Sequence, residues 1–142
     1  TGKGAEDRQG QKSYAKAATR IFNPRKIKGA PNMLLAEAGT GIGIRDAITD
    51  AAGDAPVVTK AVADAFQDTD LASHLEGVDE LMICGMMTQN CVVFTAMSRA
   101  ADGFELSVVS DLCTAPSEIV HRIALNALGS KTKVTEASAL WE

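Results

Sequence analysis

One segment near the middle of the chain, residues 81–98, joins a short apolar run to a longer one through a break. Residues 81–84 have the composition of a buried strand, and residues 85–90 interrupt it. Cys91 then begins a stretch that is typical of a helix. This pattern predicts a cysteine at a helix N-terminus, where free backbone N–H groups and the positive end of the helix dipole favour a thiolate and can hold an oxyanion.

The rest of the chain alternates predicted helices and strands. Pro24 limits the first helix, Asp68 or Thr69 can cap the second, and Ser117 and Gly129 bound the last. Continuous apolar strands between helices predict an α/β fold, a Rossmann-like three-layer sandwich with a mostly parallel sheet and helices on both faces. The helices are expected over residues 11–22, 69–76, 91–101 and 117–128, with a short helix or a lid over 42–52. The strands are expected over residues 32–36, 56–59, 81–86, 104–109 and 132–135.

Two features of this order converge on one edge of the predicted sheet. Lys60 follows the strand over residues 56–59, and the turn over residues 85–90 follows the next strand. Ligands of open α/β sheets bind beyond the carboxyl ends of the strands. We therefore expect Lys60 and Cys91 to meet there.

Composition limits the kind of protein. A chain of 142 residues that is 46% hydrophobic can bury a substantial core in one domain. The net charge of −4 without a basic stripe, together with 4% aromatic residues, argues against a nucleic-acid partner and favours a small-molecule substrate. No apolar run has the roughly 20 residues that cross a bilayer. Three cysteines without metal-ligand spacing predict a reduced cytoplasmic protein in which Cys84 and Cys113 are structural.

Two motifs then carry a family resemblance. Gly85-Met-Met-Thr-Gln-Asn-Cys91-Val92, with Thr95-Ala96 one turn later, resembles the nucleophile motif of the isochorismatase-like cysteine hydrolases, which include nicotinamidases and related amidases. Upstream, Val57-Val58-Thr59-Lys60 followed by Ala65-Phe66-Gln67-Asp68-Thr69-Asp70-Leu71 is similar to that family's lysine strand and its continuation. The resemblance runs from about Pro56 to Trp141.

The resemblance implies a mechanism and a set of roles. Cys91 would attack an amide-type C–N bond of a small molecule through a thioester, with Lys60 as its electrostatic partner. The backbone N–H groups of Met87 and Cys91 would form the oxyanion hole, beside a cis peptide between Met86 and Met87. Phe66 and Thr88 would contact the substrate. The expected assembly is a homo-oligomer, a dimer or a tetramer.

The family's first strand has no clear counterpart here. Members begin with an apolar strand in the middle of the sheet that ends in an aspartate, the general base, whereas no apolar run precedes the first predicted helix. Asp7 is one candidate for this base. The alternative is that the single domain over residues 1–142 lacks the family's first strand, and that an apolar strand ending in aspartate precedes Thr1 in the natural protein.

The sequence predicts no metal and no cofactor. Some members bind a metal through histidines and an aspartate near the second strand, but Ala36-Glu37-Ala38 stands there, and His74 and His121 have no partner at metal-ligand spacing. A structural or solvent-facing role is expected for both histidines. Two further readings stay open beside an amidase: an isochorismatase-type hydrolase of a non-amide substrate, and a catalytically silent member that acts as a binding or assembly module.

A dinucleotide fingerprint is a weaker alternative. Residues 39–45 read Gly-Thr-Gly-Ile-Gly-Ile-Arg after an apolar strand, but Ile44 stands where the third glycine of Gly-x-Gly-x-x-Gly should be. Asp64 lies at about the distance of a ribose-binding acid, in the wrong kind of segment. A substrate-covering loop is the better interpretation of these residues.

Overall fold

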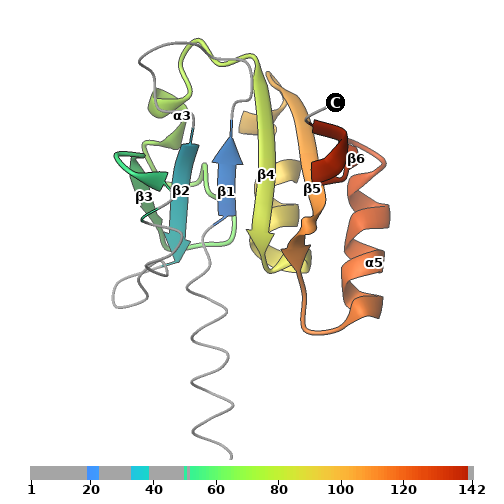
Figure 1. Ribbon diagram of the computed structural model, residues 1–142. Coiled ribbons are helices and arrows are strands. Elements are labelled where there is room, and N and C mark those ends of the chain that lie inside the picture. The colour runs from blue at the N-terminus through green and yellow to red at the C-terminus, as the bar shows by residue number, and fades with distance from the viewer. Residues whose placement is uncertain (1–18, 23–32, 39–49, 51, 141–142) are drawn as a thin grey trace, which may run out of the picture.

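The computed structural model describes residues 19–22, 33–38, 50 and 52–140. Six strands of this part form one sheet in the order β3-β2-β1-β4-β5-β6 (Figure 1). Strands β2 to β6 run parallel to one another, and β1 runs antiparallel to its two neighbours, β2 and β4. The strands are β1 (Thr19–Phe22), β2 (Met33–Ala38), β3 (Val57–Lys60), β4 (Glu80–Met86), β5 (Glu105–Thr114) and β6 (Lys133–Thr135).

The central position of this sheet belongs to β1. A helix was expected over residues 11–22, and for residues 19–22 that prediction is wrong. Two of the four residues, Thr19 and Ile21, are β-branched and Phe22 is aromatic, so they suit a pleated surface once partners exist on both sides. Backbone pairing with β2 and β4 therefore overrides the helical composition. Because β1 is antiparallel, its C-terminal end lies at the edge opposite to the ends of β3 and β4.

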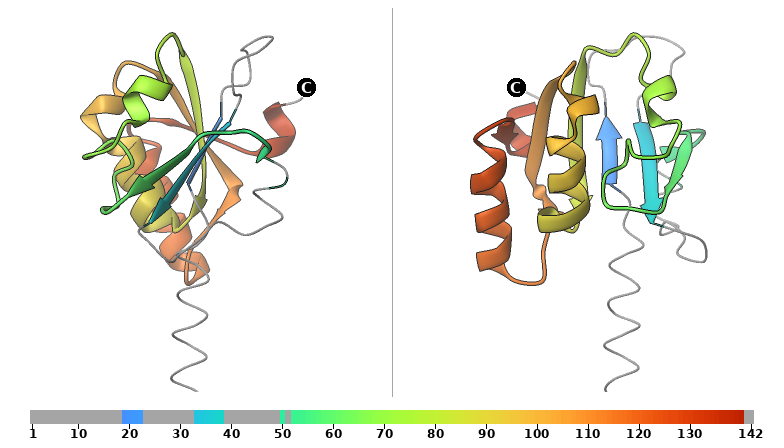
Figure 2. Two further views of the ribbon diagram at one scale, coloured as in Figure 1. Left: turned by 90° about the vertical axis from the view of Figure 1, so that its left-hand side faces the viewer. Right: turned by 180° about the vertical axis from the view of Figure 1, so that it is seen from behind.

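Helices cover the sheet unevenly. Helices α3 (Leu71–His74), α4 (Val93–Met97) and α5 (Glu118–Leu128) lie on one face, and the short 3-10 helix η3 (Ala137–Leu140) lies on the other (Figure 2). The helix predicted over residues 117–128 is confirmed, with the Ser117 hydroxyl accepting from the N–H of Val120 at its start. Together with the mostly parallel sheet, these helices confirm the α/β fold. None of the helices in the described part is long and apolar enough to cross a membrane.

The helix predicted over residues 91–101 is divided into three short pieces. A π-helical turn, η1 (Thr88–Val92), leads into α4, and a 3-10 helix, η2 (Arg99–Ala101), follows. Ser98 separates the last two because its ψ of 140° is extended. Its hydroxyl accepts from the N–H of Ala100, a local bond that competes with helix continuation.

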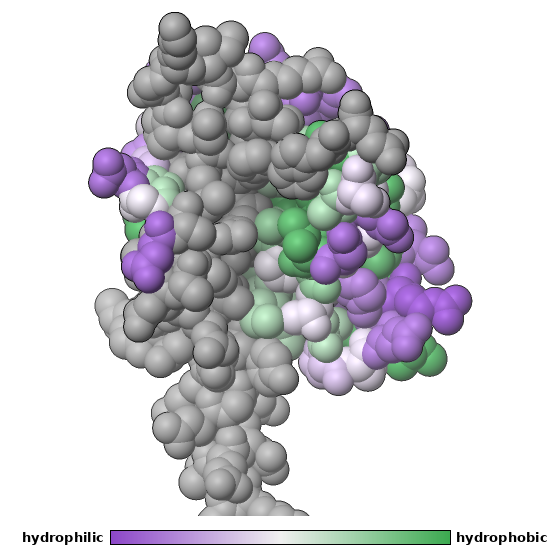
Figure 3. Space-filling model, in the orientation of Figure 1, coloured by the Kyte–Doolittle hydropathy of each residue, from purple (hydrophilic) through white to green (hydrophobic). Residues whose placement is uncertain are grey.

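The core lies between the sheet and the helices. Its largest fully buried side chains come from β3, β4 and β5 on one side and from α3, η1, α4 and α5 on the other. On the face of the sheet opposite to α4, apolar side chains are visible beside a hydrophilic region at the right (Figure 3). The largest of the core's fully buried apolar residues are Val58, Leu71, Leu81, Ile83, Val92, Val108 and Leu128.

Candidate active site

Lys60 and Cys91 meet at the carboxyl edge of the sheet. Lys60 is the last residue of β3 and Cys91 lies in η1, which follows β4 after a single residue, Met87. The Lys60 Nζ donates to the Cys91 Sγ at 3.2 Å and to the Val62 carbonyl oxygen at 2.8 Å. Lys60 is only 2% exposed, whereas Cys91 is partly buried. Two residues 31 positions apart in the chain thus form one polar contact at the predicted place.

The turn between β4 and η1 presents Cys91. Gly85 has a φ of 120°, a conformation that suits glycine, and the peptide bond between Met86 and Met87 is cis. The carbonyl oxygen of Met87 accepts from the N–H groups of Asn90 at 2.9 Å and Val92 at 3.4 Å. The chain therefore passes from a buried strand into a tight helical turn around the cysteine, as the strand–turn–helix pattern predicted, although that turn is π-helical.

Thr95 holds the segment after β3 against α4. Its side chain is fully buried, its oxygen accepts from the N–H of Ala65 at 3.0 Å, and its O–H donates to the carbonyl of Ala63 at 3.4 Å. Thr95 belongs to the nucleophile motif of the sequence, but no role was predicted for it. A threonine four residues after the cysteine, on the same face of the following helix, was the available signal.

Thr88 and Phe66, predicted to contact the substrate, have protein partners. The fully buried Thr88 places its Oγ1 2.8 Å from the Nδ1 of His121 on α5. Phe66 stacks on Phe104, with ring centroids 6.4 Å apart. Neither contact joins these residues to Lys60 or Cys91, and their substrate contacts stay predictions.

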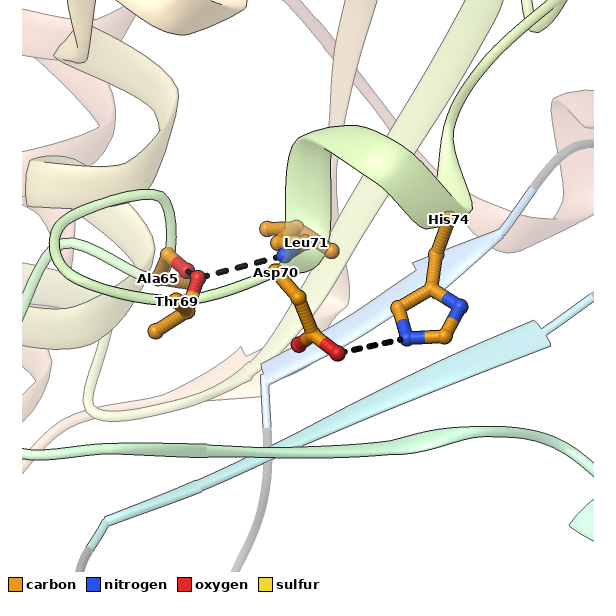
Figure 4. Close-up of polar contacts among 5 residues, drawn as sticks. All are labelled: Ala65, Thr69, Asp70, Leu71 and His74. Carbon is orange, nitrogen blue, oxygen red and sulfur yellow. Dashed lines mark hydrogen bonds and ion pairs between the residues drawn. The ribbon is translucent and has the colours of Figure 1, made fainter.

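The two histidines differ in position. His121 shares its face of α5 with the buried residues Ala124 and Leu128, at a spacing that could have indicated its inward position. His74 is exposed and its Nε2 lies 3.2 Å from the Oδ2 of Asp70 (Figure 4). In the part of the chain that the structure describes, no group of three or more histidine, cysteine or acidic residues is arranged to hold a metal ion.

The other two cysteines lie in the core of the sheet. Cys84 on β4 and Cys113 on β5 are both buried. Burial, together with the nearby Cys84 and Asp111, raises the pKa of the Cys113 thiol to about 12, although a backbone hydrogen bond with Gly85 lowers it in part. Cys113 therefore stays protonated at neutral pH, as suits a structural residue.

Some predicted features lie outside the described residues. These are Asp7, the candidate general base, and the glycine-containing segment over residues 39–45. Asp64 was the candidate ribose-binding acid of the dinucleotide alternative. Its Oδ1 accepts a hydrogen bond from the N–H of Phe66 at 2.9 Å, within its own turn.

The chain matches a known protein family. Residues 15–138 match the isochorismatase domain, a span that covers most of the chain and both motifs. The chain belongs to the isochorismatase family. The structure of an isochorismatase-like hydrolase from Alkaliphilus metalliredigens has a TM-score of 0.59 and 32% identity, over 63% of this chain and 52% of that one.

Two further relatives extend the comparison. The isochorismatase family protein YddQ of Bacillus subtilis is 36% identical over 96 residues, which are 57% of this chain and 53% of YddQ. The pyrazinamidase of Pyrococcus horikoshii, solved in complex with zinc, has a TM-score of 0.54 and 29% identity, over 59% of this chain and 52% of that one. This isochorismatase-family chain therefore spans about half the length of the relatives that it matches.

Proposed function

We propose that this isochorismatase-family chain carries the nucleophile and its cationic partner in a cysteine hydrolase that cleaves a C–N bond of a small carboxamide through a thioester. The observation that carries the proposal is the contact of 3.2 Å between the Lys60 Nζ and the Cys91 Sγ. A buried lysine and a partly buried cysteine, brought together at the carboxyl ends of two strands, match the chemistry that the family resemblance implies.

The charge of Lys60 supports a nucleophilic Cys91. An ammonium that is 2% exposed is costly unless its protons have acceptors and a negative charge lies nearby. The Val62 carbonyl supplies one acceptor. A Cys91 thiolate supplies the other together with the compensating charge, and a charge-assisted hydrogen bond stabilises that thiolate. The pair thus favours the reactive form of the cysteine.

The proposed reaction proceeds in two steps. The thiolate of Cys91 attacks the carbonyl carbon, the C–N bond breaks, and the amine leaves with a proton delivered by a general acid. Water then attacks the thioester, with its proton taken by the same group, and releases a carboxylic acid and the free cysteine. The resemblance assigns the acid–base group to an aspartate, for which Asp7 is the candidate within this sequence.

The nucleophile turn supports the tetrahedral intermediate in this proposal. The N–H groups of Met87 and Cys91 hold the oxyanion, because both belong to the turn that delivers the Sγ. Phe66 and Thr88 flank the substrate. The printed name of the P. horikoshii relative, a pyrazinamidase, supports an amide as the bond that is cleaved.

We also propose that the protein acts as a homo-oligomer, a dimer or a tetramer. Ile119 and Ile123, one turn apart on α5, are 68% and 63% exposed, and paired apolar side chains of this kind favour self-association. Sedimentation of the full-length protein is expected to give a dimer or larger, and replacing both isoleucines by lysine is expected to weaken it. A full-length protein that sediments as a monomer at micromolar concentration would contradict this proposal.

Selective alkylation tests the proposed nucleophile without knowledge of the substrate. At pH 7, iodoacetamide is expected to label Cys91 at least about tenfold faster than Cys84 or Cys113, because only Cys91 combines access with a cationic partner. Since the pKa of Cys113 is about 12, its labelling is expected only in strong alkali or after unfolding. Peptide mapping by mass spectrometry measures all three rates in one sample. Equal labelling of the three cysteines, or faster labelling of Cys113, would overturn the proposal.

A further inference from the structure

The two segments that carry Lys60 and Cys91 touch at a second place. Thr95 lies on α4, four residues or about one helical turn after Cys91. Its buried hydroxyl forms hydrogen bonds with the backbone of Ala63 and Ala65, which lie shortly after Lys60. The segment after β3 is therefore attached to the nucleophile turn by the Lys60–Cys91 contact and to α4 by Thr95.

These contacts share a short stretch of backbone. The Lys60 ammonium donates to the carbonyl of Val62, and the residue that follows, Ala63, accepts from Thr95. A shift of this stretch away from α4 would move the Val62 carbonyl and with it one of the two acceptors of the ammonium. The orientation of the ammonium toward the Cys91 Sγ thus depends on where residues 62–65 lie.

We propose that Thr95 is a positioning residue, which fixes residues 62–65 on α4 and so holds the Lys60 ammonium against the Cys91 Sγ. This inference rests on the proposed cysteine hydrolase function. The N–H of Ala65 is buried and its described partner is the Thr95 hydroxyl. Without that hydroxyl the amide would have to find another acceptor, and the segment would move to provide one.

Thr69 supports the same segment from the other side. Its O–H donates to the carbonyl of Ala65 at 2.6 Å, and its oxygen accepts from the N–H of Leu71 at 3.3 Å, at the start of α3 (Figure 4). Ala65, which is fully buried, is therefore held at its N–H by Thr95 and at its carbonyl by Thr69. Thr69 offers a second, milder way to loosen the segment.

Two substitutions distinguish the effect of the Thr95 hydroxyl from the effect of the side-chain volume. Thr95→Val keeps the volume and removes the hydroxyl, whereas Thr95→Ser keeps the hydroxyl. In the full chain, Thr95→Val is expected to slow alkylation of Cys91 by iodoacetamide at pH 7 at least about tenfold, and Thr95→Ser is expected to restore the rate to within about threefold of wild type. Thr132→Val is the control. Thr132 is a buried threonine whose hydroxyl, among the described residues, donates a hydrogen bond only to the Leu128 carbonyl. This substitution is expected to leave the rate unchanged.

A second background tests whether Thr95 acts through Lys60. In a Lys60→Met chain, Thr95→Val is expected to cause no further loss of Cys91 reactivity, because the ammonium that it positions is absent. A merely structural role would slow alkylation by the same factor in both backgrounds, and that result would overturn the proposal. An unchanged rate for Thr95→Val in the wild-type background would also overturn it.

The outcomes separate this inference from the proposed function. If wild-type Cys91 reacts no faster than Cys113, the proposed function fails and the positioning role fails with it. If wild-type Cys91 is fast and Thr95→Val is equally fast, only the positioning role fails. Should Thr95→Val not fold, Thr69→Val decides in its place: a rate reduced at least about threefold supports the proposal, and an unchanged rate overturns it.

Discussion

Replacement of Cys91 by alanine is expected to lower kcat/KM of the full-length protein on small carboxamides at least about a thousandfold, a loss of ~4 kcal/mol in transition-state stabilisation. The substitution removes the atom that forms the thioester. Because alanine is smaller than cysteine, the fold should persist, but the melting temperature is expected to fall, since the buried Lys60 ammonium loses the thiolate that compensates its charge. Steady-state kinetics against a panel of carboxamides, with thermal melting beside it, measures both effects.

The control for this substitution is a cysteine outside the proposed site. Cys113→Ala removes a buried thiol of the sheet and is expected to keep the activity while costing some stability. Retention of more than about a tenth of the wild-type kcat/KM by Cys91→Ala, a loss under ~1.4 kcal/mol, would show that covalent catalysis by Cys91 is wrong. Activity on a non-amide substrate alone would instead favour the isochorismatase-type alternative.

Replacement of Lys60 by methionine is expected to lower kcat/KM about a hundredfold, ~2.7 kcal/mol, without lowering the melting temperature. Methionine has a similar length, so it fills the site of a side chain that is 2% exposed. It also removes the need to bury a charge, and an exchange of buried charge for apolar packing is often neutral or stabilising. A loss of activity with no loss of stability would therefore separate an electrostatic role from a structural one.

A surface lysine and a double mutant complete this test. Lys131→Met removes an exposed ammonium that pairs with Asp102, and it is expected to leave the kinetics unchanged. Combining Lys60→Met with Cys91→Ala should give a variant little worse than Cys91→Ala alone, because residues that act as one unit lose their effect together. Losses that simply multiply would mean that Lys60 does not act through Cys91.

Much of the fold was predictable because its signals are local. Apolar runs with turns between them place β2, β3, β4 and β6 to within two residues, whereas β5 extends five residues beyond the expected end. Ser117 and Gly129 mark the ends of α5. The exception is β1, whose four residues become a strand through pairing with β2 and β4. That pairing depends on partners more than ten residues away in the chain, and a local pattern does not contain it.

The site shows the same division between local and distant information. The break after β4 points to Cys91, and the family motif points to Lys60. Because both residues follow parallel strands, the direction of the strands predicts that they meet at one edge of the sheet. The hydrogen bonds of Thr95 to Ala63 and Ala65, and of Thr88 with His121, were not predicted. They depend on how a loop and a helix dock on η1 and α4, which residue spacing does not determine.

The two residues of the site are carried by strands that differ in their position in the sheet. With four residues, β3 forms one edge of the described sheet, whereas β4, which leads to Cys91, has strands on both sides. Edge strands open in local fluctuations that cost less free energy than global unfolding, and hydrogen exchange of their amides reports such openings. Each opening of β3 would carry Lys60 away from a cysteine that stays with the centre of the sheet. The population of the intact Lys60–Cys91 contact would then follow the local stability of the β3 edge, and the site would lose it under mild denaturing conditions while most of the domain remained folded.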